Sequence, residues 1–169
     1  MNYYLVILRI LHIGAGVFWV GSTLLLAFVI SPALKETGKS GQKFVDYLVK
    51  NKRFGTESAG AGGMAGLAGI LLYWHDSQGL TSAWMHSSAG IGFGIGAGLA
   101  LIAFIFGILT DRKMKAMLQL REQIQDTPSD EQTLQLQELG KQQSTYLYIC
   151  AIALTLALWV MASARYFVF

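Results

Sequence analysis

The stretch YLVILRILHIGAGVFWVGSTLLLAFVI, residues 4–30, decides the fold class of this chain. It exceeds the roughly 20 apolar residues that a helix needs to cross the hydrocarbon core of a bilayer. Near its start it holds one basic residue, Arg9, and one histidine, His12. No basic segment precedes it and it is longer than the apolar part of a signal peptide, so we expect a retained transmembrane helix.

Three further apolar stretches follow, at residues 55–74, 89–110 and 146–169. The composition is that of a membrane protein, because 53% of the 169 residues are hydrophobic and only 14% are charged. We therefore predict an all-α fold, with a single membrane domain over residues 1–169 built as a bundle of four transmembrane helices. The lone cysteine, Cys150, excludes an intrachain disulfide.

The basic residues predict the orientation of this bundle. Of the 13 Lys and Arg residues, all but Arg9 and Arg165 lie in the connections after the first and third apolar stretches, and residues 76–85 contain none. Positively charged loops stay in the cytoplasm. We expect a multi-pass protein of the inner or cell membrane with both termini on the outer side. The positive charge reports orientation, and we expect no nucleic-acid partner.

The segment between the third and fourth stretches, residues 111–145, has a helical composition with scattered apolar side chains. Within it, Thr127-Pro128-Ser129-Asp130 predicts a helix start in which Thr127 is the cap and Pro128 the first helical residue. We expect a helical hairpin that continues the third and fourth helices into the cytoplasm. Its Gln-rich surface indicates solvation, and docking of a partner there stays open.

Three histidines, His12, His75 and His86, fall toward the outer face in this topology. An ionisable residue in a membrane segment is costly and marks a candidate functional site. Neutral imidazole is a common axial ligand of haem iron, and helix bundles build such sites in their cores. We predict b-type haem, with His12 and His86 as axial ligands to iron and His75 in reserve. The protein would then be a one-electron redox component, with a quinone or porphyrin as candidate partner.

Further residues are candidates for the haem site because of their spacing from the histidines. Small residues one and two turns along a helix leave room for a flat macrocycle, although the same spacing serves close helix packing. Arginine pairs with anionic propionates, although it also snorkels at helix ends. These candidates are Gly16 and Trp19 after His12, Gly90 and Gly94 after His86, and the arginines Arg9 and Arg165.

Other uses of the histidines stay open. His75 and His86 have aromatic neighbours and can belong to the aromatic belt at the membrane surface. Copper favours histidine together with methionine, as in Met85-His86. If the histidines bind copper, the chain is a copper-handling protein. If they belong to the aromatic belt, it is a structural subunit of a larger membrane complex with no cofactor of its own.

Leu11-His12-Ile13, followed by Phe18-Trp19-Val20-Gly21, resembles the opening helix of a superfamily of small four-helix membrane proteins. This superfamily includes the CopD-type copper-resistance proteins and the HemJ-type protoporphyrinogen oxidases. Trp84-Met85-His86 is similar to the HemJ pattern of tryptophan, any residue, histidine. The resemblance implies a haem-binding scaffold at His12 and His86. In the HemJ pattern a lysine follows this histidine, whereas Ser87, Ser88 and Ala89 follow His86 here. The resemblance therefore does not extend to protoporphyrinogen oxidase activity, and another oxidoreductase activity stays open.

The glycines of the third helix predict an association of helices. Residues four apart in two offset registers, Gly90/Gly94/Gly98 and Gly92/Gly96, give small faces that allow close approach in a membrane. One face would serve a neighbour within the chain, and the other a cofactor or a second protomer. We therefore expect a homodimer or a place in a larger membrane complex.

Overall fold

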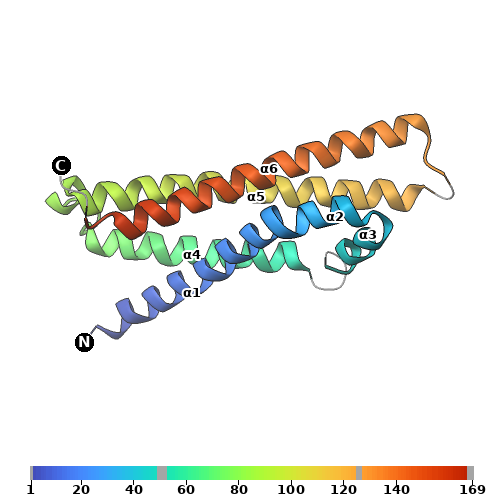
Figure 1. The fold of residues 1–169 in the computed structure, drawn as a ribbon. Helices are drawn as coiled ribbons and strands as arrows, with labels where there is room; N and C mark the ends of the chain where they lie inside the picture. The colour runs from blue at the N-terminus through green and yellow to red at the C-terminus, as the bar shows by residue number, and fades with distance from the viewer. Residues whose placement is uncertain (1, 49–52, 125–126, 167–169) are drawn as a thin grey trace.

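The computed structural model describes residues 2–48, 53–124 and 127–166, and all regular secondary structure among them is helical. The long helices are α1 (Tyr3–Leu25), α4 (Phe54–Asp76), α5 (Ser88–Gln123) and α6 (Asp130–Ser163). They run lengthwise beside one another, with α5 packed along α6 and α1 packed along α4 (Figure 1). The all-α prediction is confirmed.

Among the described residues, three helices are long and apolar enough to cross a membrane: Tyr3–Leu34, Ser88–Gln123 and Asp130–Ser163. The first of these runs through α1 and beyond it without a break. α4 corresponds to the second predicted span and has 23 residues. It is not among the three, because its many glycines contribute little hydropathy. The chain thus has helices that fit a bilayer, and a span by α4 stays a prediction.

The connections gather at two ends of the molecule (Figure 1). Both described termini lie at the same end as the α4–α5 connection, which contains the 3-10 helix η3 (Ala83–His86). We call this the η3 end. The opposite end, the α3 end, holds α2 (Ser31–Thr37), α3 (Lys39–Asp46) and the turn between α5 and α6.

The first helix changes its winding before α2. Residues Leu26–Ile30 form a π-helical turn, η1, and Pro32 follows it at the start of α2. Proline has no backbone N–H, so it cannot donate the helical hydrogen bond to the carbonyl of Phe28. Interrupted hydrogen bonding of this kind accompanies irregular helical turns. Both α2 and α3 lie in a region that the sequence predicted only as a connection.

The start of α6 corrects one sequence prediction. The cap is Ser129 and not Thr127, and the helix begins at Asp130, so Pro128 lies outside it. Ser129 Oγ accepts a hydrogen bond from the Gln132 N–H at 3.2 Å, and the Gln132 side chain accepts one from the Ser129 N–H at 2.9 Å. This reciprocal capping box satisfies two backbone donors, whereas a Thr127 cap offers no such partner.

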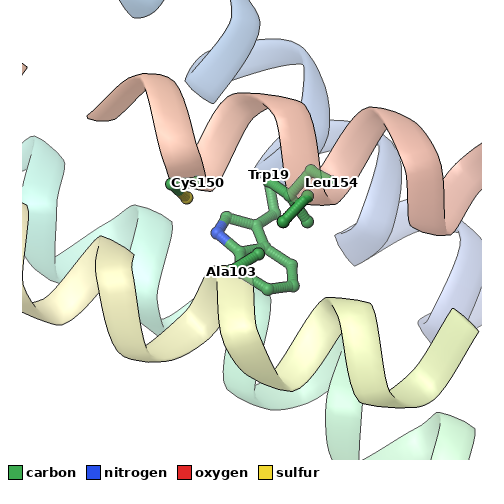
Figure 2. Close-up of a cluster of buried hydrophobic side chains, with 5 residues drawn as sticks. Trp19, Ala103, Cys150 and Leu154 are labelled. Carbon is green, nitrogen blue, oxygen red and sulfur yellow. The ribbon is translucent and has the colours of Figure 1, made fainter. Parts of the chain in front are cut away.

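Trp19 lies at the centre of the buried core, between α5 and α6 (Figure 2). Its indole packs edge-on against Phe104, with ring centroids 6.0 Å apart. It also faces Gly62 of α4, where a methyl group would lie 2.9 Å from the indole. One aromatic side chain therefore touches all the other long helices, and Gly62 makes room for it. Around it are Ala103, Cys150, Ala153 and Leu154.

Close packing of α5 against α6 uses two glycines. A methyl group built on Gly92 would lie 2.7 Å from Cβ of Ala164, and one on Gly96 would lie 2.5 Å from Cγ of Met161. Both glycines are buried. This is the glycine face that serves a neighbour within the chain. Gly98, of the other register, has open space beside it, so association with a second protomer stays a prediction.

Candidate functional site

His12 has a defined partner inside the helix assembly. Its Nδ1 lies 2.8 Å from the backbone carbonyl oxygen of Ala65 on α4. A carbonyl oxygen only accepts hydrogen bonds, so Nδ1 carries the proton and donates. In the neutral ring, Nε2 then carries the free lone pair. The contact fixes both the orientation of the imidazole and the nitrogen that is available to a ligand.

Gly69 allows this contact. It lies one turn after Ala65 on α4, and a methyl group built on it would lie 2.9 Å from Cε1 and 3.0 Å from Nδ1 of His12. Any side chain at this position would therefore push the imidazole away. On α1, Gly16 lies one turn after His12 and has open space where its side chain would be. The glycine that contacts the imidazole is therefore Gly69 of α4, which was not predicted, and the role of Gly16 beside the imidazole stays a prediction.

His75 lies at the surface of the η3 end. It is near the end of α4, with its side chain 46% exposed, and its Nδ1 is 3.3 Å from the Asp76 carboxylate. An exposed ion pair between adjacent residues contributes little to stability. The geometry is that of a solvated helix end.

His86 is the last residue of η3, and it is exposed. The two glycines that follow it differ. Gly90 is buried, and a side chain there would collide with the backbone of Trp84 and Met85, so this position serves packing and leaves no room for a macrocycle. Gly94 is exposed, and a methyl group there would meet only the Tyr73 hydroxyl at 3.5 Å, so its role beside a macrocycle stays a prediction.

An aromatic cluster holds η3 in this position. The ring of Trp84 packs edge-on against Tyr73 at 5.3 Å and stacks on Phe93 at 6.3 Å between centroids. The Tyr73 hydroxyl donates to the Gly90 carbonyl at 3.3 Å. These contacts join α4, η3 and the start of α5, and they account for the glycine at position 90.

The three histidines have different surroundings. His12 is bonded to α4 and partly buried, whereas His75 and His86 are exposed at the η3 end, and no hydrogen bond joins His12 to either of them among the described residues. Within the same residues, no group of three or more His, Cys, Asp or Glu side chains is arranged to hold a metal ion.

The remaining predicted site residues differ in their surroundings. Arg9 and Arg165 are exposed, and neither pairs with a carboxylate among the described residues. Trp19 is 7% exposed and belongs to the core, which accounts for it without a cofactor. Of the predicted histidines, His12 alone is bonded to another helix, and Gly16, one turn later on α1, has open space at its own position.

The structure also contains a cavity that the sequence analysis missed. It lies toward the α3 end, where η1, the start of α4, α5 and α6 meet, and its volume is about 190 Å³. No sequence motif indicates it, because its walls come from segments far apart in the chain. The irregular turn η1 next to Pro32 is the one local signal, since Leu26 and Ile30 line the cavity.

No protein-family model, no curated protein and no solved structure matches this chain. The resemblance of its first helix to the CopD-type and HemJ-type proteins therefore stays a prediction.

Proposed function

We propose that this chain is a multi-pass membrane protein that binds b-type haem through His12 and takes part in one-electron transfer. The observation that carries the proposal is the hydrogen bond from His12 Nδ1 to the Ala65 carbonyl. Histidines that ligate metals commonly donate their second ring N–H to a carbonyl or carboxylate, which orients the ring and raises its basicity. Such an imidazole, half-buried between two apolar helices, suits an axial ligand.

The residues around His12 fit a flat cofactor better than those around His86. Gly16 leaves open space on the His12 face of α1, whereas Gly90 is covered by its own chain. Haem, when bound, supplies a one-electron iron couple whose potential depends on axial ligand and burial. Arg9, exposed and one turn before His12, would neutralise a propionate. His86 is the second ligand candidate and His75 the reserve.

The same proposal includes α4 as a fourth membrane span. At 23 residues it is about 35 Å long, which is enough to cross the hydrocarbon core. Between Glu57 near its start and Asp76 at its end it carries no Asp, Glu, Lys or Arg. Its packing along α1 covers two of the glycines that lower its hydropathy, Gly62 and Gly69, whereas Gly60, Gly63 and Gly66 face open space.

The charge distribution supports an orientation with the η3 end outside. The segments at the α3 end carry the lysines and arginines that follow the first and third predicted spans. The η3 end has only Arg9 and Arg165. By the positive-inside rule the α3 end faces the cytoplasm, where α5 and α6 would extend beyond the bilayer as a hairpin. The haem would then lie in the outer half of the membrane.

The test of haem binding is a spectrum of the purified protein. Protein produced with an adequate haem supply and isolated in mild detergent is expected to show a Soret band and, after reduction, an α band. The haem content should approach one per chain. A preparation without these bands, from cells whose other cytochromes are loaded, contradicts the proposal.

A second candidate function is that of a structural or copper-handling subunit without haem. The observation that favours it is again His12, because its hydrogen bond already joins α1 to α4 without any ligand. In that case the His12→Ala variant loses some stability but no cofactor. A copper role would depend on His86 and Met85 at the η3 end, so copper binding by the His12→Ala variant would favour it.

A further inference from the structure

The cavity toward the α3 end has mostly apolar walls. The rings of Trp19 and Phe104 contribute to them, together with Leu26 and Ile30 of the π-helical turn. Gly107 adds to the space, because it has no side chain and a methyl group there would meet only Cys150, at 3.7 Å. The cavity is therefore built from segments of the first helix, α4, α5 and α6, on the side of Trp19 away from the η3 end.

Three polar side chains in the wall, Ser31, Ser58 and Gln143, make no side-chain hydrogen bond to any residue that the structure describes. Thr23 and Thr110 also line the cavity, but their hydroxyls donate to carbonyls of their own helices, each at 2.8 Å. Ser31, Ser58 and Gln143 are all partly buried, and none of them is among the fully buried polar atoms without a partner, so their hydroxyl and amide groups are free to hydrogen-bond to a guest.

The charge in this region is already compensated. Asp111 lines the cavity, and its carboxylate pairs with Lys115 at 2.6 Å, one turn later on α5. The remaining wall is apolar apart from hydroxyl and amide groups. A charged guest would lose its hydration without gaining an opposite charge, so the cavity suits a neutral molecule.

The cavity is partly open, so its volume sets the scale of the part of a guest that it encloses and not the size of the whole guest. A cavity of about 150 Å³ holds one benzene ring in a protein core, and this one measures about 190 Å³. We propose that it binds a neutral compound of one or two fused rings that carries carbonyl or hydroxyl oxygens. The aromatic walls accommodate the ring, and Ser58 and Gln143 bond to the oxygens. The head group of a membrane quinone belongs to this class.

This site is independent of haem at the η3 end. Its walls contain none of the three histidines. Binding can therefore be measured in the haem-free protein, so failure of the haem proposal and failure of this one are distinguishable.

The experiment uses the fluorescence of Trp19, which lines the cavity. Trp74, Trp84 and Trp159 are changed to Phe in the full-length chain, and the protein in detergent is titrated with 2-methyl-1,4-naphthoquinone. Saturable quenching is expected. Gly107→Leu fills the cavity and should weaken binding at least tenfold. Gly98→Leu, on the same helix but facing open space, is the matched control and should bind as the parent does.

Two further variants test the polar groups without filling the cavity. Ser58→Ala and Gln143→Leu each remove one hydrogen-bonding group and should weaken quinone binding by roughly two- to tenfold. 2-Methylnaphthalene, which has the rings but no oxygen, should displace the quinone only weakly. Quenching that does not saturate, or that is equal in Gly107→Leu and Gly98→Leu, overturns the proposal. The proposal is also overturned if oleate or 2-methylnaphthalene displaces the bound quinone as effectively as unlabelled quinone does. Oleate would then identify the occupant as an acyl chain, and 2-methylnaphthalene would show that any apolar molecule binds.

Discussion

The Nδ1 atom of His12 and the carbonyl oxygen of Ala65 lie 2.8 Å apart and join two helices across 53 residues of sequence. The bond places an imidazole between α1 and α4 and leaves Nε2 as its free nitrogen. A histidine within apolar helices needs such a partner, because an unpaired polar group there is costly. The same contact makes the ring available to a ligand and holds the helices in register.

Gly69→Ala is expected to disturb this contact. The added methyl group would lie 2.9 Å from the imidazole, so either the ring or α1 must move. We expect a loss of about 1–3 kcal/mol in stability, as for overpacked interiors. Thermal unfolding followed by circular dichroism in detergent measures it. Gly66→Ala, which faces open space on the same helix, is the control and should be neutral or slightly stabilising. Equal effects of the two substitutions would contradict the placement of His12.

Gly92→Ala is expected to separate α5 from α6. Its methyl group would meet both Cβ of Ala164 at 2.7 Å and the backbone Cα at 3.0 Å, and backbone cannot turn aside. Gly96→Ala should be milder, because its neighbour Met161 is a flexible side chain. Gly92→Ala should have the lowest midpoint of thermal unfolding, Gly96→Ala a higher one, and the control Gly98→Ala the highest of the three. If Gly92→Ala instead leaves stability unchanged and alters only the oligomer mass, the face belongs to a second protomer.

Ser129→Ala should fray the start of α6. The substitution removes the hydrogen bond that the Gln132 N–H donates to Ser129 Oγ, at a cost of about 1 kcal/mol. Hydrogen exchange of the first turn of α6 should accelerate while exchange in the apolar half of the helix stays the same. Thr127→Ala, which removes the cap expected from sequence, should leave exchange unaltered. If Thr127→Ala instead accelerates hydrogen exchange in the first turn of α6, Thr127 is the helix cap, as the sequence predicted.

Cysteine labelling tests the orientation. In a Cys150→Ala background, Ala83→Cys places an exposed thiol at the η3 end, and Gln135→Cys places one on the hairpin at the other end. A membrane-impermeant maleimide added to intact cells should label the first variant. It should label the second only after the membrane is permeabilised. The reverse pattern would place the basic segments outside and the histidines at the cytoplasmic face.

The positions of the long helices could be predicted from sequence because they depend on local composition. Apolar length alone locates α1, α5 and α6, and the start of α4 at Phe54 lies one residue from the predicted start. Individual contacts depend on how helices far apart in the chain meet. Nothing local distinguishes Gly69, which faces His12, from Gly66, which faces open space.

The candidate site could be predicted only in part for the same reason. His12 was found because a histidine in an apolar helix is unusual, but its partner Ala65 has an ordinary side chain and acts through its backbone. Gly90 was misassigned because the turn at Trp84 folds back on it, which no spacing rule foresees. The unpartnered Ser58 and Gln143 become notable only when the cavity between the helices is known.

The most direct test of the central claim is a haem titration of three single variants. The haem-free wild-type protein, His12→Ala, His86→Ala and His75→Ala are titrated with haemin in detergent, and the Soret band is followed. If His12 supplies the ligand, His12→Ala should lose the Soret shift of the ligated haem and bind at least tenfold more weakly. His75→Ala should behave as wild type, and a change in His86→Ala would identify the second ligand. A His12→Ala protein that binds haem with the wild-type spectrum and affinity would contradict the assignment of His12 as the haem ligand.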